Sequence, residues 1–202
     1  MLSINPANNT VRENYKLLIG SVIPRPIAFI TSIGENEVIN GAPFSYFNIV
    51  SAEPPMISVS VQRKGVEQKD TARNICKHKE FVIHIVDEDN VTKINDTSAS
   101  LRPNESEVEM AKLTLTESES IKTPGIKEAK IRFECELEKC IELGDGNNIN
   151  TDFIIGKIVR IHVDEKVYKN GKIMYEKLNA MSRLAGNDYA KIGKIVTIER
   201  PK

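Results

Sequence analysis

The sequence carries no excess of charge of either sign, because 28 lysines and arginines balance 28 aspartates and glutamates. Composition therefore gives no electrostatic reason to expect binding to nucleic acid or to an acidic membrane surface. Long hydrophobic runs are also missing, and no stretch reaches the roughly eighteen apolar residues of a membrane-spanning helix. Met1–Arg12 lacks the basic start and apolar run of an export signal. The sequence therefore predicts neither insertion into a membrane nor secretion.

Cysteine is scarce, and the three present are Cys76, Cys135 and Cys140. They are too few and too irregularly spaced for a disulfide framework, and no C-x-x-C pair suggests zinc or thioredoxin-type chemistry. This usage is typical of a reducing compartment. A cytoplasmic location is therefore expected.

Several catalytic signatures are absent as well. No histidine has a metal-like spacing from a cysteine or a carboxylate, so no metal site is predicted. Gly144–Gly146 has two glycines at dinucleotide-loop spacing, but no third glycine opens a helix there. No serine lies in a G-x-S-x-G elbow. The sequence identifies no nucleophile, and the catalytic residues stay unassigned.

What the sequence does contain is a repeated alternation of apolar and polar residues, the signature of strands with one face in a core. The 202 residues, 40% of them hydrophobic, suffice for one domain spanning residues 1–202 with a substantial core. Strands are predicted at Ile27–Ile33, Ile57–Gln62, Phe81–Val86, Ile131–Leu137, Phe153–Val163 and Lys194–Glu199.

Turn residues and one helix complete the pattern. The Gly34–Gly41 stretch predicts a hairpin that returns through Val38 into a shaped loop at Gly41–Phe47. Asn170-Gly171 predicts a type I′ hairpin. Lys69–Cys76 predicts a short helix capped by its Asp or Thr. Asp87–Ser120 gives no clear boundaries. Many short strands, few helices and no regular β-α-β alternation favour an antiparallel barrel over a doubly wound sheet.

One constellation of residues suits an anionic ligand. Ser60 and Arg63 end one predicted strand, and Lys69, Asp70 and Thr71 begin the predicted helix. Backbone N–H groups at a helix N-terminus attract anions, and nearby cations and a hydroxyl strengthen that attraction. The alternative is that Asp70 merely caps the helix and that the two basic side chains are solvated.

Several ordered motifs, read together, resemble one known family. They are Pro24–Ser32 (PRPIAFITS), Asn40–Ser51 (NGAPFSYFNIVS), Pro54-Pro55, Lys69–Ile75 (KDTARNI), Asp152–Val163 (DFIIGKIVRIHV) and Arg183–Ala190 (RLAGNDYA). In this order they resemble the flavin reductase-like, FMN-binding split-barrel family, and within it the flavoredoxin branch.

The resemblance implies a mainly β fold with peripheral helices, namely a six-stranded antiparallel split β-barrel of Greek-key topology. It also implies a homodimer that holds FMN non-covalently near the subunit interface. The implied residues around the isoalloxazine and ribityl groups are Thr31, Ser32, Ala42, Pro43, Phe44 and Ser45. The implied phosphate-end residues are Ser60, Lys69, Asp70 and Thr71, with Arg25 and Arg63 as helpers and Tyr189 closing the pocket. For Phe44 and Tyr189, simple core packing is the alternative.

The sequence departs from the family pattern at one place. Many flavin reductases carry Gly-Asp-His before a Phe-x-x-Gly-Glu-Val strand, whereas here Gly146 stands where that histidine would be and Lys157 replaces the glutamate. The resemblance implies an oxidoreductase that passes electrons from NAD(P)H through FMN to flavin or another acceptor. Because the histidine is missing, a flavoredoxin-like electron carrier without NAD(P)H activity is an alternative nearly as well supported as the reductase. A non-redox FMN-binding module is a further alternative.

Overall fold

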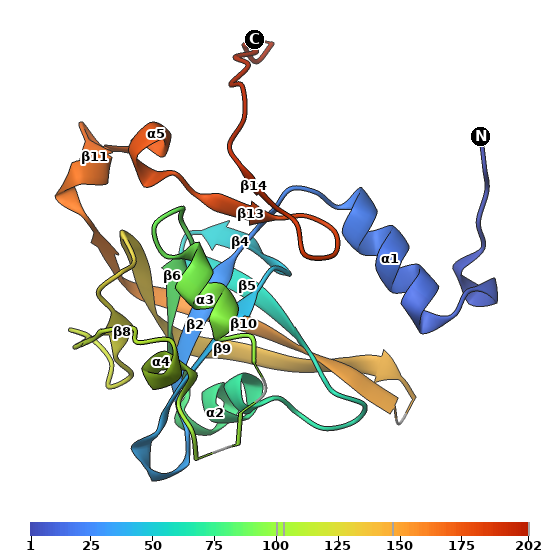
Figure 1. Ribbon diagram of the computed structural model, residues 1–202, viewed down its shortest axis with the longest axis horizontal. Coiled ribbons are helices and arrows are strands. Elements are labelled where there is room, and N and C mark those ends of the chain that lie inside the picture. The colour runs from blue at the N-terminus through green and yellow to red at the C-terminus, as the bar shows by residue number, and fades with distance from the viewer. Residues whose placement is uncertain (100, 103, 147, 202) are drawn as a thin grey trace.

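The computed structural model describes residues 1–99, 101–102, 104–146 and 148–201 (Figure 1). Its main element is an antiparallel sheet in the strand order β3-β2-β6-β9-β10-β5-β4. The strands are β2 (Ala28–Ile33), β3 (Ile39–Phe44), β4 (Phe47–Ala52), β5 (Pro55–Gln62), β6 (Glu80–Ile85), β9 (Ile131–Asp145) and β10 (Asn148–Val163). The sheet curls but its two edge strands do not pair, so it is an open, split barrel.

Smaller elements surround this sheet. The helices are α1 (Val11–Ser21), α2 (Asp70–His78), α3 (Val91–Asp96), α4 (Glu107–Met110) and α5 (Tyr175–Leu178), with 3-10 turns at Pro6–Asn8, Glu35–Glu37 and Glu165–Val167. A second sheet joins β1 (Arg25–Pro26), β13 (Met181–Arg183) and β14 (Tyr189–Lys191). Two small hairpins pair β7 (Leu115–Thr116) with β8 (Gly125–Ile126) and β11 (Tyr168–Lys169) with β12 (Lys172–Ile173).

The long β9–β10 hairpin gives the sheet its curl. Its ladder is interrupted at three positions, including Ile155/Gly156 and Ile158/Arg160, and such irregularities bend a strand. Gly156 lies on the concave face, where a Cβ atom would collide with the ring of Phe81. Glycine is therefore required at this position for the strands to approach so closely.

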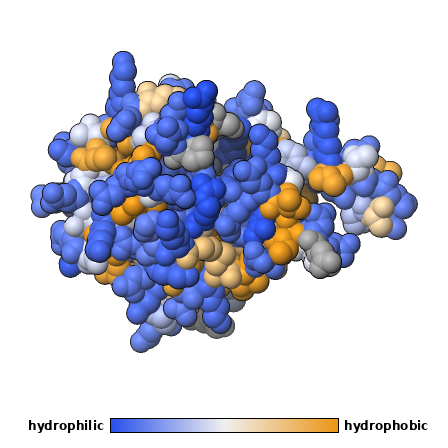
Figure 2. All heavy atoms as spheres, turned by 90° about the horizontal axis from the view of Figure 1, so that it is seen from below, coloured by the Kyte–Doolittle hydropathy of each residue, from blue (hydrophilic) through white to orange (hydrophobic). Residues whose placement is uncertain are grey.

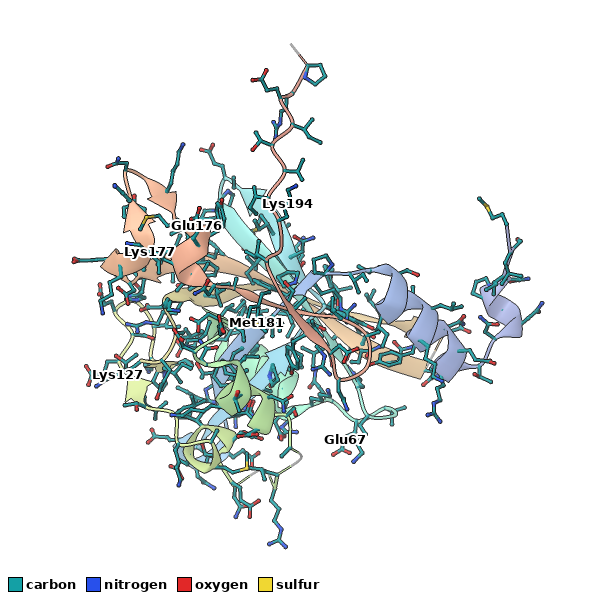
Figure 3. The ribbon with its side chains drawn as sticks, turned by 45° about the horizontal axis from the view of Figure 1, so that its top comes forward. Glu67, Lys127, Glu176, Lys177, Met181 and Lys194 are labelled. Atoms are coloured by element: carbon teal, nitrogen blue, oxygen red, sulfur yellow. The ribbon has the colours of Figure 1, made fainter. Side chains whose placement is uncertain are left out.

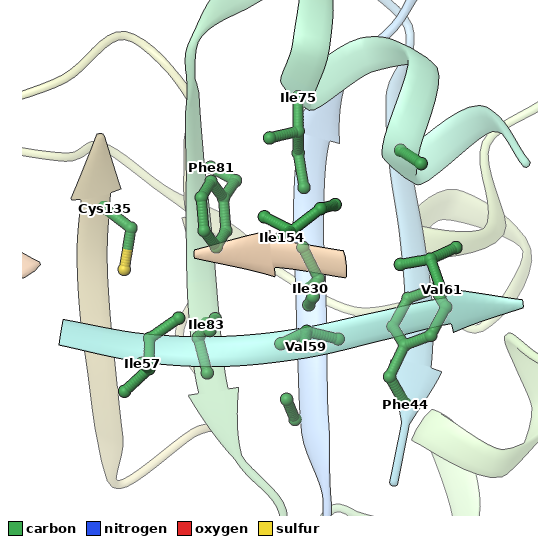
Figure 4. Close-up of a cluster of buried hydrophobic side chains, with 12 residues drawn as sticks. Ile30, Phe44, Ile57, Val59, Val61, Ile75, Phe81, Ile83, Cys135 and Ile154 are labelled. Carbon is green, nitrogen blue, oxygen red and sulfur yellow. The ribbon is translucent and has the colours of Figure 1, made fainter. Parts of the chain in front are cut away.

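The curled sheet encloses the main core. Side chains from six of its strands meet there, and α2 covers the open end with Ala72 and Ile75, both fully buried (Figure 4). Ile30, Phe81 and Ile154 are buried to the same degree. The predicted alternation in these strands is the direct cause, because every second side chain points inward.

A second apolar cluster lies on the opposite face of β2 and packs under α3 and α4. Phe29, Ile94 and Val108 belong to it. His84 is buried beside Phe29 and is neutral, because its Nε2 accepts from the Ile126 N–H at 3.0 Å and its Nδ1 donates to the Phe29 carbonyl at 3.0 Å. Burial lowers the pKa of His84 to about 3.

The predicted split-barrel class is confirmed. The predicted strands at Ile27–Ile33, Ile57–Gln62 and Phe81–Val86 match β2, β5 and β6 to within two residues, and Phe153–Val163 is the second part of the longer β10. The Asn170-Gly171 hairpin is confirmed too, since φ is 51° and 76° at these residues. The strand predicted at Ile131–Leu137 is twice as long as expected, because β9 continues beyond the part that pairs with β6 and pairs with β10 over its whole length.

The predicted loop at Gly41–Phe47 is wrong, because β3 continues to Phe44 and β4 begins at Phe47. Pro43 suggested a loop, but β3 is an edge strand that pairs only with β2, so a missing N–H is tolerated there. Ser45 and Tyr46 alone make the connection, and the sheet thereby extends to a seventh strand among the described residues.

Two further expectations need correction. Lys194–Glu199 forms no strand, because it alternates in sequence but lies exposed without a neighbour to pair with; the last strand is β14. Figure 3 shows Met181 against the body and Lys194 on the segment that leads away from it. Neither Asp70 nor Thr71 is the N-cap of α2; Lys69 occupies that position, and Asp70 pairs with Arg73 instead.

Helix α1 was not predicted from the sequence. Its start is nevertheless marked, because Thr10 and Glu13 form a capping box, with the Thr10 N–H donating to Glu13 Oε2 at 2.8 Å. Over the described ranges, no helix has both the length and the apolar character that crossing a membrane requires.

Candidate functional site

The residues of the predicted site gather around Pro43 and Phe44, at the end of β3. Three adjoining hollows share these two side chains, and we refer to them together as the Phe44 groove. The first hollow, about 340 Å³, extends toward α2 and the segment after α3. The second, about 130 Å³, extends toward β5, and the third, about 210 Å³, toward β14. Pro43 and Phe44 give the groove a rigid apolar wall.

The N-terminus of α2 opens into the first hollow. Its N-cap residue, Lys69, makes no side-chain capping hydrogen bond, so the first backbone N–H groups of the helix have no side-chain partner. The Lys69 ammonium lies 5.8 Å from the centroid of the Phe44 ring. Burial lowers the pKa of Lys69, because the charged form loses hydration. A cation and unpaired N–H groups beside an apolar wall suit an anionic group attached to an aromatic one.

A polar network supports this end of the groove from below. Thr71 Oγ1 donates to Asn40 Oδ1 at 2.9 Å, and Asn40 Nδ2 donates to Glu107 Oε2 at 2.9 Å. The Gly41 N–H donates to the same carboxylate oxygen at 3.2 Å. Burial raises the pKa of Glu107. The Thr71 hydroxyl already donates to Asn40. Thr71 would therefore donate to an anion through its backbone N–H.

Gly41 has a steric reason to be glycine. A Cβ atom at this position would lie 2.7 Å from both Phe29 Cζ and Val108 Cγ2. Any larger residue would therefore displace β3 or α4, and both carry groups of the network described above.

Thr31 and Ser32 lie behind the groove and do not line it. Both are fully buried in β2. Thr31 Oγ1 donates to the Pro124 carbonyl at 2.7 Å, and Ser32 Oγ accepts from Asn74 Nδ2 at 3.2 Å. In this structure the two side chains therefore tie β2 to its neighbours.

Arg25 and Arg63 use their guanidinium groups within the protein. Arg25 borders the second hollow, but it donates to the backbone carbonyls of Ile19, Val22 and Leu184 at 2.5 to 2.8 Å, and so joins α1 to the segment after β13. Arg63 pairs with Asp152 at 2.6 Å and with Glu142 at 2.5 Å. The Arg63 side chain therefore neutralises a fully buried Asp152 and is not on the wall of the Phe44 groove.

The other predicted residues do border the groove. Ala42, Asp70 and Thr71 line the first hollow, Ser60 lines the second, Ser45 lines the second and third, and Tyr189 lines the third. Asp70 faces Arg73 of its own helix. The Tyr189 hydroxyl donates to Asn95 Oδ1 at 2.8 Å, and its ring packs against the Arg183 guanidinium.

Several groove residues were not predicted from the sequence. They are Tyr15, Asn40, Gln68, Arg73, Asn95, Thr97, Ser98, Glu107 and Arg183. Asn40, Arg73 and Arg183 fell inside recognised motifs, so a signal existed for these three, and Gln68 directly precedes one of those motifs. The rest come from α1 and the region 87–120, where the pattern gave no boundaries. Over the described ranges, no three His, Cys, Asp or Glu side chains are grouped to hold a metal.

The fold and the groove together define an open split-barrel protein in which a lysine and an uncapped helix N-terminus lie beside an apolar wall. A family model described as "Flavin reductase like domain" matches residues 19–179. The chain belongs to this family, which confirms the resemblance found in its motifs. The chain is also 49% identical over 195 residues to the uncharacterized protein YwrF of Bacillus subtilis, and the match covers 95% of each chain.

Solved structures are also similar to this chain. Nitrilotriacetate monooxygenase component B from Bacillus cereus is 57% identical, with a TM-score of 0.96 and 98% of each chain covered. Flavoredoxin of Desulfovibrio vulgaris is 21% identical, with a TM-score of 0.75, covering 88% of this chain and 91% of the other. The second likeness is one of fold.

The assignment of Arg63 to the barrel rather than to the groove can be tested by substitution. We expect Arg63→Met to lower the melting temperature clearly, because it leaves the buried Asp152 carboxylate without its counter-ion. Glu142→Gln is the matched control and should change the melting temperature little, since Glu142 is half-exposed. Thermal unfolding followed by circular dichroism measures both. Equal melting temperatures for Arg63→Met and the wild type would contradict the structural role.

Proposed function

We propose that the chain is an FMN-dependent oxidoreductase, which takes electrons from NAD(P)H and passes them to free flavin or another acceptor. The observation that carries the proposal is the uncapped N-terminus of α2, with Lys69, opening beside the apolar Pro43–Phe44 wall. Membership of the flavin reductase family and likeness to a component of a monooxygenase support it. We place the whole activity in one domain spanning residues 1–202.

The residues of the groove fit the two ends of FMN. Lys69 and the first N–H groups of α2 would bind the phosphate, which carries up to two negative charges near neutral pH. Ala42, Pro43 and Phe44 would bind the isoalloxazine through apolar contact, and the bound flavin supplies the hydride and electron chemistry. The Asn40–Glu107 contact fixes the backbone of Gly41 and so holds the wall in place.

No side chain of the groove needs to transfer a hydride, which is why the missing Gly-Asp-His histidine does not exclude the reaction. Gly144 and Asp145, the remnant of that motif, lie exposed at the tip of the β9–β10 hairpin. The role of this chain is to bind the flavin, orient it and leave one face open to a donor.

Two other functions stay as alternatives. A flavoredoxin-like electron carrier without NAD(P)H activity is favoured by the absent histidine, and the structural likeness to a flavoredoxin supports the same fold for both. A non-redox FMN-binding module would use the same groove. The donor separates these alternatives, because only the reductase accepts electrons from a nicotinamide nucleotide.

Replacement of Lys69 tests the phosphate end. We expect Lys69→Ala to weaken FMN binding by about tenfold or more, because a charge-assisted hydrogen bond is lost. Lys77→Ala is the control, since Lys77 is an exposed cation at the far end of the same helix. Titration with FMN, followed by flavin fluorescence, measures both. Equal losses in the two variants would refute the assignment.

The same titration has a pH dependence with a defined sign. Burial lowers the pKa of Lys69, so the free protein loses this proton earlier in the alkaline range than an exposed lysine does. FMN binds the protonated form, and its affinity for the wild type should therefore fall as pH rises through that pKa. Lys69→Arg keeps its charge, and its affinity should stay level over the same range.

Anaerobic reduction tests the reaction itself. With FMN bound, mixing with NADH and with NADPH in a stopped-flow instrument should bleach the flavin absorbance rapidly with at least one of them. Subsequent reduction of added free flavin would complete the proposed sequence. Bleaching only by a reduced ferredoxin-type protein would transfer the assignment to the electron carrier, and no reduction by any donor would exclude both redox functions.

We also propose a homodimer, with α1 at the contact between subunits. Helix α1 and the C-terminal segment project from the body (Figure 1) and expose Leu18, Val22, Val196 and Ile198. A hollow of about 460 Å³ beneath α1 is lined by Leu18, Val22, Pro24, Phe47 and neighbouring residues. In Figure 2 hydrophilic side chains cover most of the visible face, with apolar patches near the projecting arm. Exposed apolar surface of this kind favours association.

Sedimentation velocity tests the dimer. Leu18→Glu should shift the wild-type dimer toward monomer, because a carboxylate would have to lose its water on association. Val66→Glu adds the same charge at another exposed apolar position and should leave the dimer intact. A wild type that is monomeric at high concentration would contradict the proposal. A cytoplasmic location, expected from the cysteine usage, stays a prediction.

A further inference from the structure

Arg183 occupies the end of β13, where three side chains line up across a small sheet. Its register partners are Arg25 on β1 and Tyr189 on β14. Residues directly opposite one another on antiparallel strands have their side chains on the same face of the sheet. Arg25, Arg183 and Tyr189 therefore form a row along one side of the Phe44 groove.

The two arginines of this row differ in what their donors do. Arg25 is buried and donates to three backbone carbonyls. Arg183 is half-buried and donates to one, the Gly186 carbonyl, at 2.6 Å. Among the residues that the structure describes, Arg183 takes part in no ion pair. Its remaining N–H groups are therefore available to a ligand.

Packing holds this guanidinium in a defined orientation. Its central carbon lies 4.4 Å from the centroid of the Tyr189 ring, in a cation–π contact. The Tyr189 hydroxyl in turn donates to Asn95, which precedes the end of α3. Tyr189 is thus a positioning residue for Arg183, and the stacked guanidinium presents a planar set of donors, which suits a phosphate.

Of the basic residues in the described part of the chain, five line the groove, namely Arg25, Lys64, Lys69, Arg73 and Arg183. Arg25 donates to backbone carbonyls and Arg73 pairs with Asp70, so the available cations lie at two places, Lys64 and Lys69 at one and Arg183 at the other. Lys69 lines the first and second hollows, and Arg183 lines the second and third. Pro43 and Phe44 border all three hollows and lie between these positions. FMN carries a single phosphate, and Lys69 with the α2 N-terminus accounts for it. Arg183 is therefore left for a second anionic group, on a molecule that enters beside the flavin.

We propose that Arg183 binds the pyrophosphate of the nicotinamide dinucleotide donor. The inference rests on the proposed function, because it assigns the donor of that reaction to a place in the same groove. A dinucleotide whose nicotinamide lies against the flavin must place its two phosphates a short distance away, and Arg183 offers the cation there. The chain has no Rossmann-type loop, so this contact would supply much of the donor's affinity.

Arg183→Ala and Arg183→Lys, prepared with FMN bound, test the proposal. Lys191→Ala is the matched control, because Lys191 is an exposed cation on the adjacent strand that pairs with Glu88. The measurements are kcat and KM for NADH and NADPH, the dissociation constant of FMN, and calorimetric binding of ADP-ribose. ADP-ribose carries the pyrophosphate without the nicotinamide, so its binding reports on the site independently of hydride transfer.

We expect Arg183→Ala to raise KM for the donor by about tenfold or more and to weaken ADP-ribose binding by a similar factor. Its kcat and its FMN dissociation constant should stay within about twofold of the wild type, since the interaction is made equally in the ground state and the transition state. Arg183→Lys should recover part of the loss, because it keeps the charge without the planar donors. Lys191→Ala should behave as the wild type.

Three results would overturn the proposal. The first is a KM and an ADP-ribose affinity unchanged in Arg183→Ala. The second is FMN affinity falling by the same factor as donor affinity, which would assign Arg183 to the flavin. The third is a wild type that neither nucleotide reduces, which would overturn the proposed function and this inference with it. If NADH or NADPH reduces the wild type normally and Arg183→Ala changes neither KM nor ADP-ribose affinity, the donor site is refuted but the proposed function is not.

Discussion

Helix α2 packs into the open end of the curled sheet. The closure of the barrel and the position of the candidate site both depend on this contact. Ala72 and Ile75 are fully buried against core side chains from β2, β5 and β6. Burying one isoleucine side chain contributes about 1.5 to 3 kcal/mol, so the docked position of the helix is strongly favoured. Because Phe44 belongs to the same core, the contact that closes the barrel also brings the N-terminus of α2 to the groove.

The polar groups of the site follow from the same constraint. Helix α2 presents Thr71 to Asn40 on β3, and Asn40 meets Glu107 on α4, so three elements are joined beneath the groove. The buried charge of Asp152, by contrast, is neutralised within the protein by Arg63. Lys64, Lys69 and Arg183 lie in the groove without an ion-pair partner among the described residues, so an anionic ligand would meet uncompensated positive charge there.

Much of the fold could be predicted because strands with one buried face leave a period of two in the sequence. That signal identified β2, β5, β6 and β10. It failed at Lys194–Glu199, since alternation does not guarantee a partner strand, and at Gly41–Phe44, where an edge position tolerates Pro43. The outer half of β9 was missed because it is largely exposed on both faces, and a strand segment without a buried face leaves no period of two in the sequence.

The residues of the candidate site, like the strands, could be predicted from the sequence only in part. Lys69 and the start of α2 followed from helix-terminus electrostatics, and Pro43 and Phe44 from the family motifs. Asn40 and Glu107 meet across 67 residues of sequence, and no local rule connects them. Thr31 and Ser32 carry the right chemistry for a ligand, but the fold uses their hydroxyl groups internally. Arg183 became a candidate only when the structure brought it beside Tyr189 and the groove.

The central claim is that the Phe44 groove holds a flavin with its phosphate at the N-terminus of α2. A crystal structure of the protein soaked with FMN tests this most directly. We expect the phosphate within hydrogen-bonding distance of Lys69 Nζ and of the first N–H groups of α2, with the isoalloxazine against Pro43 and Phe44. An FMN phosphate bound elsewhere, or a saturated soak with no flavin in the groove, would contradict it.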